Sequence, residues 1–340
     1  GRSLAADMGE HFKWNPSTDR LGQMLRQAVY LEDQVTLEHI LKQRANLEAK
    51  DENGWTPLHV ASMQCKPDII SWLVAHRADM TITDGSGYTP MSWACLKGHL
   101  PVIRALLDKK ADITALAESN GGKAPLSMCA ELGHMECVLE LLRRGAPLEA
   151  PNRDGTTALM CAAHHCQTEV VLHLLEKNSM INTVDKLGWH ALMYAMNAQA
   201  PPISGGGESS EQKVTIDGVM GKRTCCELLL LHGADVNHHS GDGLSALIIA
   251  AGRDRPQALK KLLEAKASVN VATLRGQTPL LMAAASGQTG MVRALIMAQA
   301  EVNHTNEKKD SALSLADKLG HKDVADLLKA SGAKEDKKKG

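Results

Sequence analysis

The stretch DENGWTPLHVA, Asp51–Ala61, decides the fold of this chain because it returns along the sequence at a nearly constant spacing. Its Thr-Pro-Leu-His part begins at Thr56. Matching four-residue slots begin at Thr89, Ala124, Thr157, His190, Ser245, Thr278 and Ser311, most of them 33 residues apart. A fixed period of this size indicates a solenoid, in which supersecondary units stack on their neighbours and bury a continuous core.

The residue types inside one copy indicate a tight turn followed by a short helix. Gly54 allows a positive φ in the turn. Thr56 is a favourable N-cap, and Pro57 suits the first helical position, where its missing N–H costs nothing. Leu58 and Ala61 then lie on one face of the helix, and the small Ala61 lets a neighbouring helix approach closely.

A second apolar stretch, Asp68–Val74, and a closing Ala78-Asp79 complete the copy, which closely resembles the ankyrin repeat. The glycine and alanine of this frame recur at Gly87, Ala94, Gly155, Ala162, Gly188, Ala195, Gly243, Ala250, Gly276 and Ala283. The resemblance implies an all-α fold, an ankyrin-repeat solenoid of helix-turn-helix units with short β-hairpin tips.

We expect nine repeats in a single array over residues 18–333. They start near residues 18, 51, 84, 119, 152, 185, 240, 273 and 306. The first repeat is cryptic, with Leu25 and Ala28 in the slots of Leu58 and Ala61, and its polar residues suit an end cap. Residues 1–17 are interpreted as an N-terminal extension and residues 334–340 as a basic tail.

The turn between the two helices of a repeat calls for a left-handed backbone, which glycine adopts without strain. Glycines that fit this position are Gly98, Gly133, Gly221, Gly287 and Gly320. Cys65, Cys166 and Asp254 stand there in three other repeats. If these turns stay left-handed, each of the three costs about 1–2 kcal/mol of backbone strain.

One repeat is much longer than the others, because the slots at His190 and Ser245 are 55 residues apart. The surplus lies within an inserted loop at residues 197–220, which is rich in proline, glycine and serine. It is either a tolerated surface insertion or a loop for docking or phosphorylation. Lys213–Ile216 has strand character and could pair with the edge of a partner's sheet.

The composition places the chain among folded globular proteins, with 44% hydrophobic and 23% charged residues among 340. The net charge of −1 predicts no general attraction to nucleic acid or to an anionic membrane. No apolar run is long enough for membrane insertion. The eight scattered cysteines favour an intracellular protein, most simply cytoplasmic, with the nucleus or an organelle as alternatives. The chain begins at Gly1, so a targeting segment is not visible.

The densest group of side chains with reactive chemistry is Cys161, His164, His165 and Cys166. Such a set could bind a metal ion or a small molecule. The repeat frame, however, buries Cys161 and puts the histidines at the exposed end of a helix, so one tetrahedral ion cannot easily reach all four. We expect packing and surface roles instead. No nucleotide-binding loop or nucleophile elbow is present in the sequence, so we expect no catalytic residue, metal, cofactor or small-molecule substrate.

The resemblance implies that a protein partner binds the concave side, made of hairpin tips and exposed parts of the first helices. Three large aromatics, Trp55, Tyr88 and Trp189, stand just before the Thr slot, and such residues are frequent interface hot spots. Alternatively, Trp55 and Trp189 merely pack across adjacent hairpins. Further candidates are Glu52, Asn53, Ser86, Lys123, Arg153, Lys186, Leu187, Leu244 and Arg275 at the tips and Met63, Lys97, His164, His165 and Arg253 at the ends of first helices.

Two other aromatics, Trp93 and Tyr194, fall in a slot that normally faces the core and are therefore left out of the predicted surface. Phe12 and Trp14 precede the cap and either cover its apolar side or belong to a partner contact.

Repeats without reactive chemistry predict a non-catalytic protein–protein interaction scaffold or adaptor. One alternative is the targeting module of a larger enzyme, channel or ubiquitin-ligase assembly. Another is a structural subunit of a large complex, for example in an organelle.

Overall fold

The computed structural model describes residues 20–118, 121–198, 212–216 and 219–334. The contacts between residues divide the chain into two compact units, unit 1 from Gly1 to Pro125 and unit 2 from Leu126 to Gly340. The predicted extension at residues 1–17 and almost all of the tail at 334–340 lie outside the described residues.

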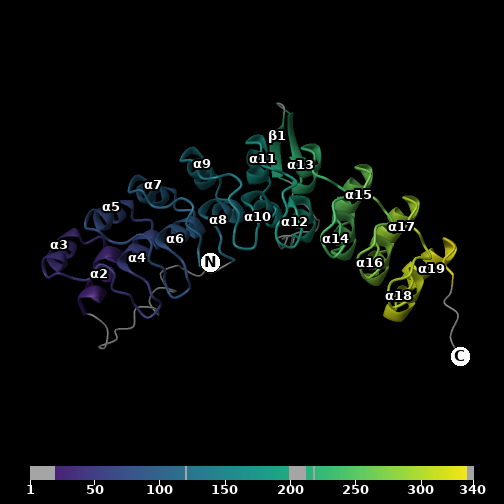
Figure 1. The fold of residues 1–340 in the computed structure, drawn as a ribbon, viewed down its shortest axis with the longest axis horizontal. Coiled ribbons are helices and arrows are strands. Elements are labelled where there is room, and N and C mark those ends of the chain that lie inside the picture. The colour runs from purple at the N-terminus through teal and green to yellow at the C-terminus, as the bar shows by residue number, and fades with distance from the viewer. Residues whose placement is uncertain (1–19, 119–120, 199–211, 217–218, 335–340) are drawn as a thin grey trace. The chain divides into compact units, whose positions relative to one another are not determined.

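Unit 1 consists of helix pairs, as the repeat pattern predicts. Its helices are α2 (Arg20–Leu31), α3 (Gln34–Lys42), α4 (Pro57–Met63), α5 (Pro67–Ala75), α6 (Pro90–Lys97) and α7 (Leu100–Asp108). The first helices pack in the order α2, α4, α6, and the second helices α5 and α7 pack beside each other. The two kinds of helix therefore form two rows (Figure 1).

Unit 2 continues the same alternation and carries the only strands among the described residues. Its helices are α8 (Pro125–Leu132), which begins at the unit boundary, α9 (Met135–Arg143), α10 (Ala158–His164), α11 (Thr168–Glu176), α12 (Ala191–Asn197), α13 (Cys225–Leu231), α14 (Ala246–Gly252), α15 (Pro256–Glu264), α16 (Pro279–Ala285), α17 (Thr289–Met297), α18 (Ala312–Leu319) and α19 (Lys322–Ala330). Neighbouring first helices pack from α10 to α18, and neighbouring second helices from α9 to α19. The predicted all-α solenoid of helix pairs is confirmed.

The Thr-Pro-Leu-His slot starts each first helix in the expected way. Thr56 has an extended backbone at the N-cap of α4, and Pro57 takes the first helical position. His59 reaches back, and its Nδ1 accepts a hydrogen bond from the Thr56 amide at 3.2 Å. Leu58 and Ala61 are fully buried and supply the apolar contact between stacked repeats.

His59 also ties its own repeat to the next one. With Nδ1 acting as acceptor, Nε2 carries the proton and donates to the Tyr88 carbonyl at 3.0 Å. His190 repeats this arrangement in unit 2, where its Nε2 lies 3.0 Å from the Asp235 carbonyl. Both rings are buried, so they act as structural hydrogen-bonding groups.

These two histidines predict a pH dependence of stability. Burial lowers the pKa of His59 and of His190 below the usual range of histidine. The unfolded chain therefore takes up protons at a higher pH than the folded chain does. The stabilisation by the neutral rings is complete above about pH 6.5 and is lost as the pH falls through the lowered values.

Urea unfolding at pH 7.5 and pH 5.0 checks this expectation. The free energy of unfolding should be smaller at pH 5.0, and the double variant His59→Gln, His190→Gln should lose less between the two pH values than the parent does. Equal losses in parent and variant would contradict the assignment of the effect to these rings.

Hydrogen bonds between neighbouring tips hold the repeats in register. The Gly85 amide donates to the Asn53 carbonyl at 2.8 Å, and the Lys186 amide donates to the Asp154 carbonyl at 3.1 Å. The side chain of Asn182 also links two repeats, since its Oδ1 accepts from the Asp235 amide at 2.8 Å. Among the described residues the tips are mostly turns, with isolated bridges at His239–Ser245 and Thr305–Ser311.

The inter-helix turns confirm the expected left-handed backbone where glycine is absent. Cys65, Cys166 and Asp254 have φ values of 57°, 56° and 53°. Gly221 is the exception, because it does not lie in an inter-helix turn but in strand β2. Strand β2 leads directly to Thr224, which has an extended backbone at the N-cap of α13 and whose hydroxyl accepts from the Glu227 amide.

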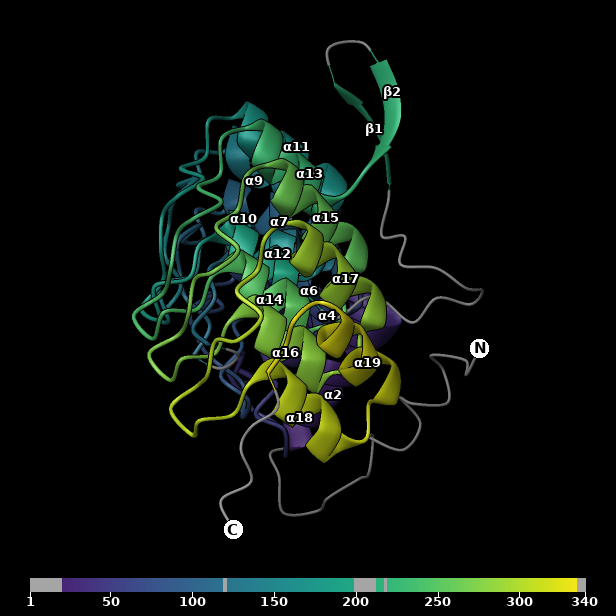
Figure 2. The ribbon, with the colours of Figure 1, turned by 90° about the vertical axis from the view of Figure 1, so that its right-hand side faces the viewer.

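The inserted segment contains a β-hairpin. Strand β1 (Gln212–Ile216) pairs antiparallel with β2 (Val219–Arg223) in a register that joins Gln212 to Arg223 and Ile216 to Val219. The predicted strand at residues 213–216 is thus confirmed, and it pairs within the chain. The hairpin contacts α11 and points away from the tips of unit 2 (Figure 2). The rest of the predicted loop, residues 199–211 and 217–218, lies outside the described residues.

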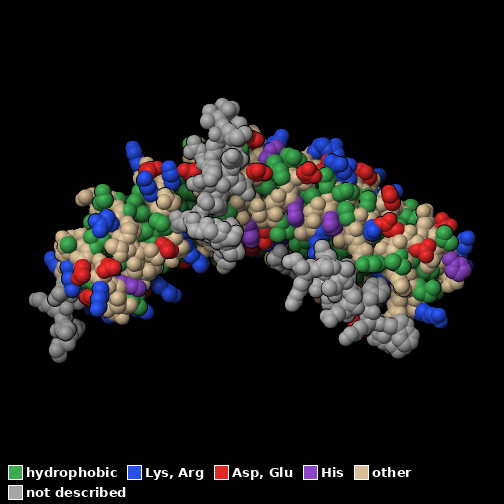
Figure 3. Space-filling model, turned by 180° about the vertical axis from the view of Figure 1, so that it is seen from behind, with side chains coloured by type: hydrophobic (Ala, Val, Ile, Leu, Met, Phe, Trp, Pro, Cys, Tyr) green, Lys and Arg blue, Asp and Glu red, His purple; other side chains and the backbone are tan. Residues whose placement is uncertain are grey.

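The surface carries charges of both signs. On the face drawn in Figure 3, acidic and basic side chains are interspersed, with hydrophobic side chains between them. No helix in the described part of the chain is long and apolar enough to cross a membrane.

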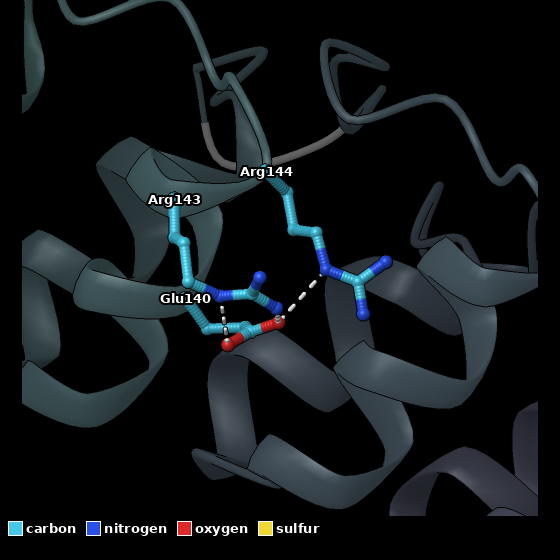
Figure 4. A network of polar contacts seen from close by, with 3 residues as sticks. All are labelled: Glu140, Arg143 and Arg144. Atoms are coloured by element: carbon cyan, nitrogen blue, oxygen red, sulfur yellow. Dashed lines mark hydrogen bonds and ion pairs between the residues drawn. The ribbon is translucent and has the colours of Figure 1, made fainter.

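One carboxylate is buried among arginines on the second-helix row of unit 2. Glu140 in α9 is only 4% exposed, and its Oε1 accepts from Arg143 Nη2 at 2.5 Å and from Arg144 Nε at 2.9 Å (Figure 4). Arg143 Nε also donates to Oε2 at 3.1 Å. Two guanidinium groups on one carboxylate make charge-assisted bonds, so Glu140 fixes the end of α9.

Candidate partner-binding site

Three aromatic side chains of unit 1 meet at the tips and form what we call the Trp93 cluster, consisting of Trp55, Tyr88, Trp93 and Asp84. Trp55 and Trp93 pack edge to face, with ring centroids 5.9 Å apart and an interplanar angle of 82°. The Tyr88 ring lies 5.5 Å from Trp93 and is tilted by 58°. All three aromatic residues are half-buried, so each keeps part of its surface open to solvent.

Asp84 holds the Trp93 cluster together through the hydrogen bonds of its carboxylate. Its Oδ1 accepts from the amides of Ser86 and Tyr88, both at 2.9 Å, which shapes the tip. Its Oδ2 accepts from the indole nitrogens of Trp55 at 3.1 Å and Trp93 at 2.8 Å. One buried carboxylate therefore fixes the backbone of the tip and the orientation of two indole rings.

Unit 2 contains a second group of this kind, the Tyr194 cluster, consisting of Trp189, Tyr194, His164 and Asp185. Trp189 and His164 lie 5.5 and 5.6 Å from the Tyr194 ring, centroid to centroid. The Tyr194 hydroxyl donates to Asp185 Oδ2 at 2.6 Å. Burial, together with this bond to Asp185, raises the pKa of Tyr194 far above its usual range, so the hydroxyl stays a donor.

The two clusters use the same local device. In each, the turn aspartate binds tip amides through Oδ1 and an aromatic donor nine residues later through Oδ2. The aromatic residue is the fourth residue of the following first helix, Trp93 in α6 or Tyr194 in α12. The signal in the sequence that could have identified both clusters is an aspartate nine residues before a tryptophan or tyrosine.

The expectation that Trp93 and Tyr194 face the core is wrong. Both are half-buried and stand beside the tips, because the fourth position of these short helices lies toward the turn aspartate. The alternative for Trp55 applies in part, since it packs on Trp93 of the next repeat. Packing and partial exposure coexist at Trp55.

The other predicted contact residues are distributed along the tips and helix ends. Those that are exposed are Glu52, Asn53, Ser86, Lys97, Arg153, His165, Lys186, Leu187, Arg253 and Arg275, and those that are half-buried are Met63, Lys123, His164 and Leu244. Leu244, Arg253 and Arg275 belong to later repeats than the Tyr194 cluster. The structure thus brings Trp55 with Tyr88, and Trp189 with His164, into two separate groups.

The four residues considered as metal ligands do not converge. Cys161 and Cys166 are buried, whereas His165 is exposed and its Nε2 faces Glu131 Oε1 at 3.4 Å. Within the described ranges, no group of three or more histidine, cysteine, aspartate or glutamate side chains has a geometry that could hold a metal ion.

The neighbouring cysteines of α13 are equally unsuited to nucleophilic chemistry. Burial raises the pKa of Cys225 and of Cys226 to about 12, which keeps both thiols protonated at neutral pH.

Comparison with known proteins identifies the repeat. The family model described as "Ankyrin repeats (3 copies)" matches residues 25–117, 118–203, 219–306 and 275–339. A stretch of 173 residues, 45% of this chain and 33% of the relative, is 27% identical to "Probable E3 ubiquitin-protein ligase XBOS33" of Oryza sativa subsp. japonica.

Two animal proteins match in the same way. "B-cell lymphoma 3 protein homolog" of Mus musculus is 29% identical over 157 residues, 45% of this chain and 30% of the relative. "Tyrosine-protein kinase Shark" of Drosophila melanogaster is 34% identical over 87 residues, 25% of this chain and 9% of the relative. The match spans a third or less of each of these relatives.

Proposed function

Because the chain belongs to the family of ankyrin-repeat proteins, we propose that it is a non-catalytic scaffold or adaptor whose aromatic clusters bind a protein partner. Repeats of this family are protein-interaction modules. The observation that supports this use of the surface is the pair of half-exposed clusters, each fixed by a buried aspartate. Rigid aromatic side chains lose little conformational entropy on binding, which suits them to be interface anchors.

Loss of the aromatic side chains should remove the partner. In the triple variant Trp55→Ala, Tyr88→Ala, Trp189→Ala, proteins captured by the parent should be depleted about 30-fold or more, since hot-spot losses are about 2 kcal/mol or larger. Quantitative mass spectrometry after proximity labelling in cells measures this depletion.

The matched control removes exposed apolar side chains that lie on or just after second helices, Met180→Ala, Leu231→Ala and Met297→Ala. It should keep the partners of the parent. Circular dichroism and thermal unfolding of both triple variants establish that they are folded. Retention of all partners by a folded aromatic variant would contradict the proposed surface.

A second candidate function is a targeting module within a larger enzyme or assembly. It is supported by the relatives, since proteins named as a ubiquitin-protein ligase and a tyrosine-protein kinase share only a third or less of their length with this chain. The mass of the endogenous protein tests it. A mass well above 36.6 kDa favours the module, and a mass close to that value argues against it.

A further inference from the structure

The Trp93 cluster holds a buried carboxylate whose hydrogen-bond donors are all neutral. Asp84 is 6% exposed, and its four donors are two backbone amides and two indole N–H groups, all of them neutral. Among the described residues, no lysine or arginine forms an ion pair with Asp84. Because the two indole N–H groups donate to Oδ2, this carboxylate lies at the N–H edges of both rings.

The same hydrogen bonds make the rings better acceptors for a cation. An indole that donates its N–H to a carboxylate is polarised toward the ring, because hydrogen bonds in a low-dielectric site polarise their partners. The negative face of tryptophan, already the best of the aromatic faces for a cation, is thereby strengthened at Trp55 and Trp93. Both residues keep part of their surface exposed.

Further negative charge lies at the preceding tip. Asp51 Oδ1 accepts from the Trp55 amide at 2.8 Å, and Glu52 beside it is exposed. Two basic residues stand against this charge. The exposed Lys97 follows Trp93 by four residues on α6 and so lies near it, and the exposed Lys50 donates from Nζ to the Thr83 carbonyl, beside Asp84, at 2.9 Å. The Trp93 cluster and its rim therefore combine three aromatic rings with three carboxylates and two lysines, and the carboxylate of Asp84 is the one hydrogen-bonded to the rings.

We propose that the Trp93 cluster binds an arginine side chain presented by the protein partner. The proposal rests on the proposed function, because it names the group that the same surface would recognise. Trp55 meets Trp93 edge to face at 5.9 Å, and Tyr88 is tilted by 58° against Trp93 at 5.5 Å, so the rings contact one another and form an open, angled surface rather than an enclosing cage. A planar guanidinium stacks on such a surface, whereas a compact ammonium is better held by a surrounding box.

The Tyr194 cluster is a weaker candidate for this role. Its aspartate, Asp185, accepts from the Tyr194 hydroxyl, and in the described part of the chain it accepts no hydrogen bond from the Trp189 indole, so the two polarised indoles of the Trp93 cluster have no counterpart there. The inference is therefore specific to unit 1.

The test titrates the blocked peptide Gly-Gly-Arg-Gly-Gly into the ¹⁵N-labelled full chain and follows the indole N–H signals, assigned with single Trp→Phe variants. The signals of Trp55 and Trp93 should shift saturably. The signal of Trp72, which lies on α5 and stacks on His76, should not.

Two further peptides test the chemistry. The same peptide with citrulline, which has the shape of arginine without its charge, should bind about 2- to 30-fold more weakly, as loss of a cation–π contact predicts. The lysine peptide should also bind more weakly than the arginine peptide. If the citrulline peptide binds as tightly as the arginine peptide, the claim that the cluster recognises a positive charge is wrong. If the lysine peptide binds as tightly, the preference for a guanidinium group is wrong.

Two surface variants should act in opposite directions. Glu52→Gln should weaken binding of the arginine peptide about two- to fivefold, and Lys97→Gln should strengthen it by a similar factor. Absence of a saturable shift at Trp55 and Trp93, or the same response in both variants, overturns the proposal. If the aromatic triple variant still loses its partners in that case, the proposed function stands and only the arginine is wrong.

Discussion

Replacing Gly54 with alanine is expected to lower the free energy of unfolding by about 3 kcal/mol, although only one methyl group is added. Gly54 has φ +78°, which costs an alanine about 1–2 kcal/mol. The added Cβ would lie 2.4 Å from the Gly85 nitrogen, which is backbone and cannot turn aside. That amide makes the hydrogen bond between neighbouring tips, so relief of the clash breaks this bond as well.

Gly145→Ala separates the two contributions. Gly145 has φ +87° and no atom within 4 Å of the added Cβ, so it carries the backbone cost alone. Urea unfolding should place this variant about 1–2 kcal/mol below the parent and Gly54→Ala clearly lower still. Equal losses would show that the contact between tips contributes nothing. Since Gly54 precedes Trp55, its variant should also lower partner binding.

Replacing Glu140 with glutamine is expected to lower the free energy of unfolding by about 2 kcal/mol. The amide loses the charge that accepts three bonds from Arg143 and Arg144, and its NH₂ group faces their N–H donors. The loss stays below that of an isolated buried charge, because Arg143 is 62% exposed and Arg144 is 28% exposed, and both can return to water.

Glu264→Gln is the matched control. Glu264 also pairs with a residue of its own helix, Lys261 at 3.3 Å, but it is 51% exposed. Its variant should change the free energy of unfolding by less than about 0.5 kcal/mol. If urea unfolding gave the same small change in the free energy of unfolding for both variants, the ion pairs of Glu140 would contribute no more than an ordinary surface pair.

The fold was predictable because the residue types within each copy specify its backbone conformation. Gly54, Thr56 and Pro57 mark a turn and a helix start within four residues, and Leu58 and Ala61 mark the buried face. Even where the turn glycine is replaced by Cys65, the stacked helices enforce the left-handed backbone. Repetition supplied what a single copy cannot, namely the neighbour on which each repeat packs.

The candidate site was predictable only in part. Trp55, Tyr88 and Trp189 follow from their place beside the helix start. Trp93 and Tyr194 could not be placed from helix periodicity, because it is the side-chain bond to Asp84 or Asp185 that orients them. The prediction for Gly221 was wrong for a related reason. Its spacing fits an inter-helix turn, but it lies in strand β2, which pairs with strand β1 of the inserted segment.

The hydrogen bonds that span neighbouring repeats also set how easily the chain can find its fold. Most join residues close to one repeat length apart, such as Glu301 with Asn270, 31 residues apart, whereas across the insertion Asp235 and Asn182 are 53 apart. Loop-closure entropy grows only with the logarithm of loop length, so the longer connection costs about 0.5 kcal/mol more. Because every closure is short, folding can begin at any adjacent pair of repeats and spread in both directions, with the insertion as a slight delay rather than a barrier.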